Sequence, residues 1–151
     1  MLYQRVEAWG VSVIAVLVIL AFAGSGYLLF LDGTWPYNVV QYDSEVFPTT
    51  QQEYRPGDIV WARVKATKCR DLVGTVHWVM EDSSQPPVSF SPRPLSLGKG
   101  RWDVCRPIET IPKRTEPGIY RMRGIVAYRI NEFRTITYSV KTTDFRVLAP
   151  E

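Results

Sequence analysis

Five segments between residues 58 and 147 alternate apolar and polar residues with a period of two. Successive side chains of a β-strand point to opposite faces, so this alternation indicates strands that each bury one face. In the first segment Val60, Ala62 and Val64 share one parity, while Trp61 and Arg63 take the other. No helical apolar period occurs in this part, so the sequence predicts an all-β domain over residues 58–151. The predicted strands occupy Asp58–Lys68, Gly74–Asp82, Arg101–Ile108, Ile119–Arg129 and Thr135–Val147.

Turn residues separate these segments. Pro56-Gly57 and Pro117-Gly118 are pairs favoured at the centre of a type II turn. Prolines exclude Gln85–Pro94 from a central strand, which leaves this stretch as an edge or a protruding loop. Residues 32–57 are predicted as a linker followed by a first strand within Tyr37–Tyr42. About seven short strands separated by turns predict a sandwich of two sheets.

Several motifs resemble those of immunoglobulin-like and macroglobulin-like domains. They are Y-x-P-G-D-x-V at Tyr54–Val60, a tryptophan at Trp78, P-G-x-Y at Pro117–Tyr120 and T-x-x-F-x-V at Thr142–Val147. The resemblance implies an immunoglobulin-like sandwich in which Trp78 packs at the centre and Tyr120 forms a tyrosine corner. Met122 stands where a true immunoglobulin has its second cysteine, so the disulfide between the sheets is absent.

A charge-free apolar run, Trp9–Leu31, precedes the domain. About 20 apolar residues suffice for a helix to cross a bilayer, so the run predicts a transmembrane helix over residues 9–31. Arg5 lies before the run, and the first basic residue after it is Arg55. By the positive-inside rule, residues 1–8 are predicted to be cytoplasmic and the domain extracytoplasmic.

The segment around Ala21 carries two further interpretations. Ala21-Phe22-Ala23 matches a signal peptidase site, so a cleaved signal peptide is the alternative to an anchor. The apolar run continues to Leu31, which favours the uncleaved helix. Ala21 and Ser25 form a small-xxx-small pair that permits close packing against another helix. An anchor followed by one such domain is also similar to small single-pass membrane proteins encoded by tailed bacteriophages.

The residues able to carry chemistry are few. The net charge is +3, and the charges of the domain alternate in sign, which argues against a nucleic-acid partner. Cys69 and Cys105 are the only cysteines and form a candidate disulfide, with two free thiols as the alternative. The single histidine, His77, cannot assemble a zinc site alone. Glu81 and Asp82 are adjacent in a strand and point to opposite faces. We therefore predict no catalytic, cofactor-binding or metal-binding residues.

Two sets of outward-facing residues are candidates for a binding surface. Trp61 has outward parity and lies beside two cations, a combination that suits a partner protein or a sugar, with packing under a loop as the alternative. A row of arginines on Ile119–Arg129 suits an acidic partner or anionic headgroups, unless neighbouring acids neutralise it. The candidate residues are Trp61, Arg63 and Lys65 in the first set, and Arg121, Arg123 and Arg129 in the second.

These features lead to one main hypothesis and two alternatives. The main hypothesis is a membrane-anchored, non-enzymatic interaction or structural module with the bilayer and other proteins as partners, acting in the host envelope or virion if the phage resemblance holds. The first alternative is an accessory subunit of an integral-membrane complex, docked through its helix. The second is a domain that binds glycans or lipid headgroups. The sequence does not predict the oligomeric state.

Overall fold

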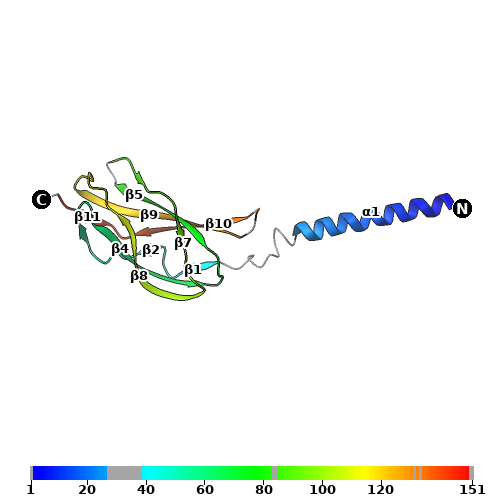
Figure 1. Ribbon diagram of the computed structural model, residues 1–151, viewed down its shortest axis with the longest axis horizontal. Coiled ribbons are helices and arrows are strands. Elements are labelled where there is room, and N and C mark those ends of the chain that lie inside the picture. Colours follow the sequence, from blue (N-terminus) through cyan, green and yellow to red (C-terminus); the bar gives the residue numbers. More distant parts are fainter. Residues whose placement is uncertain (1, 27–38, 83–84, 131, 133, 150–151) are drawn as a thin grey trace. The chain divides into compact units, whose positions relative to one another are not determined.

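The chain divides into two compact units, Met1–Tyr37 and Asn38–Glu151 (Figure 1). The computed structural model describes residues 2–26, 39–82, 85–130, 132 and 134–149, and only the backbone of residues 2–12. The second unit includes most of the region predicted as a linker. It buries Val39, Val40, Phe47 and Tyr54, so the core begins well before residue 58.

The described residues of the first unit form one helix, α1 (Leu2–Gly26). In the part of the chain that the structure describes, no helix has both the length and the apolar character needed to cross a membrane. The predicted transmembrane helix, with its single-pass topology, cytoplasmic N-terminus and extracytoplasmic domain, is therefore wrong. The predicted span counted apolar residues up to Leu31, whereas the described helix ends at Gly26, where two glycines weaken it. Residues 27–31 lie outside the described residues. Ala21 and Ser25 are exposed on α1, and their packing role stays a prediction.

The described residues of the second unit form eleven strands. The strands are β1 (Val40–Tyr42), β2 (Val46–Phe47), β3 (Glu53–Tyr54), β4 (Ile59–Lys68), β5 (Gly74–Asp82), β6 (Val88–Ser89), β7 (Arg93–Leu95), β8 (Gly100–Thr110), β9 (Gly118–Arg129), β10 (Thr135–Thr142) and β11 (Phe145–Val147). Five of them, β4, β5, β8, β9 and β10, are long and correspond to the predicted segments, and the others have two or three residues.

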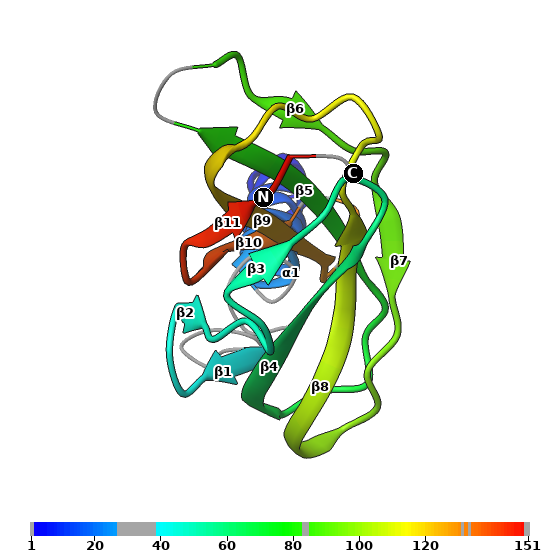
Figure 2. The same cartoon turned by 90° about the vertical axis from the view of Figure 1, so that its left-hand side faces the viewer.

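The strands build two sheets that share one core. The smaller sheet has the order β1-β4-β8. In the larger, eight-stranded sheet, β9 pairs with β5 along one edge and with β10 and β11 along the other. Strands β6 and β7 extend this sheet beyond β5, while β2 and β3 add to β10 and β11 in parallel. Figure 2 shows the larger sheet curling, with β7 beside β8 where the two sheets meet.

The predicted immunoglobulin-like sandwich of about seven strands is wrong, because one sheet is a curled half-barrel of eight strands and the other is small. The physical reason is the length of β9, whose 12 residues provide edges for three neighbouring strands. Alternation determines which face a strand buries, but it does not specify the neighbours of the strand.

The buried faces themselves follow the predicted parity. In β4 every second residue from Val60 to Lys68 is buried. Trp78 is 5% exposed in the core, as predicted. The hydroxyl of Tyr120 donates a hydrogen bond to the carbonyl of Glu116 at 2.9 Å, which is the backbone contact of a tyrosine corner. These local features of the resemblance hold although the overall sheet arrangement differs.

The turns agree with prediction in part. Gly57 has a φ of 96°, and the amide of Asp58 donates to the carbonyl of Arg55 at 3.0 Å, as a type II turn requires. Gly118 has no positive φ and begins β9 instead. The stretch Gln85–Pro94 contributes to β6 and β7, which within the described part of the chain pair only with β5, so it is an edge.

Candidate functional site

The predicted surface around Trp61 lies on the outer face of the smaller sheet. Trp61 is 41% exposed, as its parity predicted. Arg63 donates two hydrogen bonds to the Asp103 carboxylate, at 2.6 and 2.8 Å, and Lys65 lies 3.9 Å from it. Hydrogen bonding from Arg63 holds the pKa of Asp103 below its ordinary value. Both cations are therefore engaged within the sheet, and a binding role for Trp61 stays a prediction.

Two of the three predicted arginines of β9 also have acidic neighbours. Arg121 lies 3.2 Å from the Asp144 carboxylate, and Arg123 lies 2.8 Å from that of Glu81. Arg129 likewise takes part in an interaction. At Arg121 and Arg123 acids therefore balance bases, and these two positions offer little attraction to an anionic partner.

The predicted disulfide between Cys69 and Cys105 is not formed, since both cysteines are free and exposed. Cys105 lies opposite Arg63 in the ladder of β4 and β8, and Cys69 comes six residues after Arg63. At about 3.3 Å per residue the two are roughly 20 Å apart along the sheet. A disulfide requires Cα atoms within about 7 Å.

The described residues contain no cluster of three or more side chains suited to holding a metal ion. The Nε2 atom of His77 lies 2.7 Å from the hydroxyl of Ser89, a contact between exposed neighbours on β5 and β6. This contact gives His77 a structural partner on the sheet surface.

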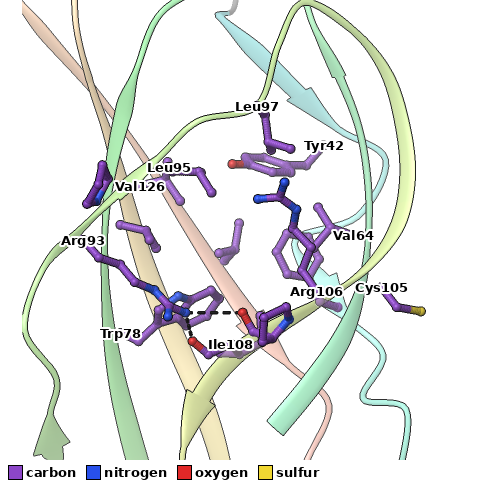
Figure 3. Close-up of a pocket in the computed structure, with 15 residues that line it drawn as sticks. Tyr42, Val64, Trp78, Arg93, Leu95, Leu97, Cys105, Arg106, Ile108 and Val126 are labelled. Atoms are coloured by element: carbon purple, nitrogen blue, oxygen red, sulfur yellow. Dashed lines mark hydrogen bonds between the residues drawn. The ribbon is translucent and has the colours of Figure 1, made fainter. Parts of the chain in front are cut away.

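A cavity of about 500 Å³ lies between the two sheets, on the side where β7 and β8 meet. Valines from four strands surround it, and these short side chains leave the space between the sheets incompletely filled. Figure 3 shows the lining residues around this space. The lining consists of Tyr42, Phe47, Val64, Val76, Trp78, Arg93, Pro94, Leu95, Leu97, Cys105, Arg106, Pro107, Ile108, Val126 and Val140.

Arg93 joins the two sheets at one end of the cavity. Its guanidinium donates hydrogen bonds to the carbonyls of Pro107, at 3.3 Å, and of Ile108 (Figure 3). It also lies 3.4 Å from the Glu109 carboxylate. Strands β7 and β8 belong to different sheets and share no ladder, so this side chain links their edges. The charge of Arg93 is thereby compensated within the protein.

Arg106 is the second cation of the lining, and it differs from the first. Its side chain is half-buried and extends into the space beside Tyr42 (Figure 3). Among the described residues it makes no hydrogen bond or ion pair. Arg106 is not among the residues predicted from the sequence to form a site. In the sequence, Trp102 and Val104 indicated which residues of β8 face inward. Arg106 has the same parity, and a charged residue on an inward position was the available sign of a site.

The ionisable residues of the lining offer little for catalysis. They are Tyr42, Arg93, Cys105 and Arg106, and the described residues that line the cavity include no carboxylate and no histidine. The sulfur of Cys105 points away from the cavity (Figure 3). A nucleophile with an adjacent base is therefore not found among these residues. The arrangement suits binding of an apolar group next to a positive charge.

Tyr42, which lines the cavity, belongs to a cluster of tyrosines whose ionisation can be tested. Tyr138 packs edge-on against Tyr42 and Tyr128, with centroids 5.8 and 6.1 Å apart. Burial raises the pKa of Tyr42 and of Tyr128 above the ordinary value of 10.0. In the unfolded chain tyrosines ionise as the pH rises above 10.0, whereas in the folded protein Tyr42 and Tyr128 remain protonated. The contribution of these two residues to the stability of the fold is therefore complete below that pH and is lost as the pH rises above it. Burial raises the pKa of Tyr120 as well. We therefore expect phenolate absorbance in an alkaline titration to show three fewer ionising tyrosines before unfolding than after it. Uniform titration of all eight tyrosines in the folded protein would contradict this.

Comparison with known proteins does not identify a family. No family model matches the chain, and no curated protein matches it. The resemblance to phage-encoded membrane proteins is therefore not tested by these comparisons.

Solved structures give low-scoring similarities. The alkylpurine DNA glycosylase AlkC of Pseudomonas fluorescens, bound to DNA containing an abasic site analogue, is 14% identical with a TM-score of 0.43, over 74% of this chain and 31% of that chain. A β-glucosidase of Listeria innocua in complex with glucose is 15% identical with a TM-score of 0.33, over 72% of this chain and 16% of that chain. The chain thus spans less than a third of either protein, and at these scores the similarities indicate neither a family nor an activity.

Proposed function

We propose that Asn38–Glu151 is a non-enzymatic binding module that takes a small, mainly apolar ligand into the cavity between its sheets. The observation that carries this proposal is the cavity itself. Its volume of about 500 Å³ falls within the range of small-molecule sites, which are largely apolar with few polar groups. The proposal keeps the non-enzymatic binding role predicted from the sequence and omits the membrane anchor.

The position of the cavity also supports binding. Its floor comes from central strands of the larger sheet, including Trp78 and Val126, while its rim comes from β7 and β8. The short strand β7 pairs only with β5, and Arg93 links it to β8. The two strands of the rim are each paired with their own sheet. Among the described contacts between them, the hydrogen bonds of Arg93 are the ones that join them, so a ligand can enter between them without disrupting the central ladders.

Two neighbouring residues of β9 provide a matched test of the proposal. Val126 is buried and lines the cavity, whereas Ile125 faces outward and is 39% exposed. Val126→Phe places an aromatic ring in the cavity, and Ile125→Phe makes a similar change on the opposite face. With full-length protein and the uncharged fluorescent probe Nile red, we expect saturable binding that Val126→Phe weakens by about tenfold or more and Ile125→Phe leaves unchanged.

Melting temperatures distinguish loss of the site from loss of the fold. A phenylalanine that fills existing space should leave the melting temperature of Val126→Phe close to that of the wild type. If Nile red does not bind saturably, or binds both variants as it binds the wild type, the cavity is not a binding site. If Val126→Phe unfolds the domain, Leu95→Phe at the rim fills the same cavity from β7 and provides the same comparison.

A further inference from the structure

The two cations at the cavity are in different electrostatic situations. Arg93 has a carboxylate neighbour and two carbonyl acceptors, so its charge and its donors are used. Arg106 has five N–H donors and no acceptor among the described residues. The cavity therefore has one uncompensated positive charge on its lining.

The backbone holds Arg106 on this face. Along β8 the inward positions pass from Val104 to Arg106, while Cys105 between them faces outward and is exposed. Because faces alternate strictly along a strand, Arg106 cannot reach the outer face of the sheet without a register change. A half-buried guanidinium beside apolar side chains loses part of its hydration. An anion that binds the guanidinium replaces the hydrogen bonds to water that were lost.

The single uncompensated positive charge at the cavity indicates which kind of anionic group fits it. A single guanidinium balances one negative charge and binds a carboxylate through two parallel hydrogen bonds. A doubly charged phosphate would leave one negative charge without a partner beside an apolar lining. Tyr42, at the same end of the cavity, keeps its proton because burial raises its pKa, so it adds no competing negative charge.

We infer that the ligand is a monoanionic amphiphile, a carboxylate with an apolar body, whose carboxylate is bound by Arg106 and whose body fills the cavity. This inference rests on the proposed function and adds the chemical class of the ligand. The valines, Trp78 and Leu95 contact the body, while Arg106 recognises the head.

Three probes that share one chain length and differ in head group test the inference. Dodecanoate, dodecanol and dodecylamine are titrated, below their micelle concentrations, against Nile red bound to the full-length protein. We expect dodecanoate to bind about tenfold or more tightly than dodecanol, since hydrogen bonds to charged groups are the stronger kind, and dodecylamine to bind weakest.

Variants then assign this preference to one residue. Arg106→Met should bring dodecanoate to the affinity of dodecanol while Nile red still binds. Arg101→Met removes the same charge from the outward, exposed face of β8 and should leave the preference intact. Arg106→Lys keeps the charge without the bidentate geometry and should bind dodecanoate with intermediate affinity.

The outcomes separate the inference from the proposed function. If dodecanol or dodecylamine binds as tightly as dodecanoate, the inference is wrong and the apolar site stands. If none of the three displaces bound Nile red, the amphiphile class is wrong. If Nile red itself fails to bind, the proposed function fails as well. If Arg106→Met does not fold, the wild-type preference and its reduction in Arg106→Lys decide the result.

Discussion

Replacement of Gly74 by alanine is expected to lower the free energy of unfolding by about 3 kcal/mol. Gly74 begins β5 and lies directly opposite Tyr128 of β9. A Cβ atom at this position would lie 2.6 Å from the Tyr128 ring, closer than carbon atoms approach in proteins. The ring is completely buried and packs against Tyr138, so it has little room to move away. Urea denaturation of the wild type and the variant measures the difference.

A double-mutant cycle tests this cause. Tyr128→Val removes the ring atoms that the new Cβ would meet and by itself costs about 3 kcal/mol of stability. On that background Gly74→Ala should cost less than about 0.5 kcal/mol, which would show that the ring is the source of the effect. Gly98→Ala is the control, because its nearest contact would be an ordinary 3.9 Å from Trp102. Equal costs of Gly74→Ala with and without the ring would refute the explanation.

Glycines on inward positions show which structural features could be predicted from the sequence and which could not. Gly124 continues the inward parity of β9, and the Trp78 ring of β5 covers it, as Tyr128 covers Gly74. The alternation of large residues correctly predicted the buried faces of these strands. It did not reveal that inward glycines are filled from the neighbouring strand, because that depends on which strands are adjacent.

The lack of information on strand pairing also explains the wrong predictions of the sheet arrangement and of the disulfide. The two-residue strands β2 and β3 are too short to show a period, and they join the sheet through parallel pairing with β10 and β11, which follow them in sequence by about a hundred residues. The candidate disulfide was predicted from the presence of two cysteines, whereas the distance between these cysteines along the ladder depends on register. Parity is local and was predicted, whereas pairing and register are set by contacts distant in sequence.

In the candidate site, too, parity was predicted correctly and the contacts between strands were not. The outward parity of Trp61 and Arg63 was correct, but the partner of Arg63 is Asp103, on a strand whose register the sequence does not specify. The cavity depends on the separation of two sheets and on where their edges meet. Arg106 was the one sign of it in the sequence, as a charged residue on an inward position.

A buried lysine gives the second prediction. Lys68, the last residue of β4, is 2% exposed. Its ammonium donates to the carbonyls of Leu72 and Leu97, and it lies 5.5 Å from the centroid of the Tyr128 ring. Lys68 thereby connects the segment after β4 to the segment before β8. Lys68→Met keeps the length of the side chain and removes both hydrogen bonds and the charge.

We expect Lys68→Met to lower the free energy of unfolding by about 2 kcal/mol. Each carbonyl left without a donor costs about 1–3 kcal/mol, and the release of a buried charge offsets part of this loss. Burial lowers the pKa of Lys68, which shows that the charged form is held at a cost. The melting temperature should fall by roughly 8 °C.

Lys65→Met on the same strand is the matched control for this variant. Lys65 is exposed, and its ammonium lies 3.9 Å from the Asp103 carboxylate, so its loss should change the stability by less than about 0.5 kcal/mol. Equal stability of Lys68→Met and the wild type would mean that the cost of burying the ammonium matches the strength of its bonds. Lys68 would then specify the positions of Leu72 and Leu97 without stabilising the fold. Because Leu97 also lines the cavity, Nile red affinity would fall in that case while the melting temperature stayed constant.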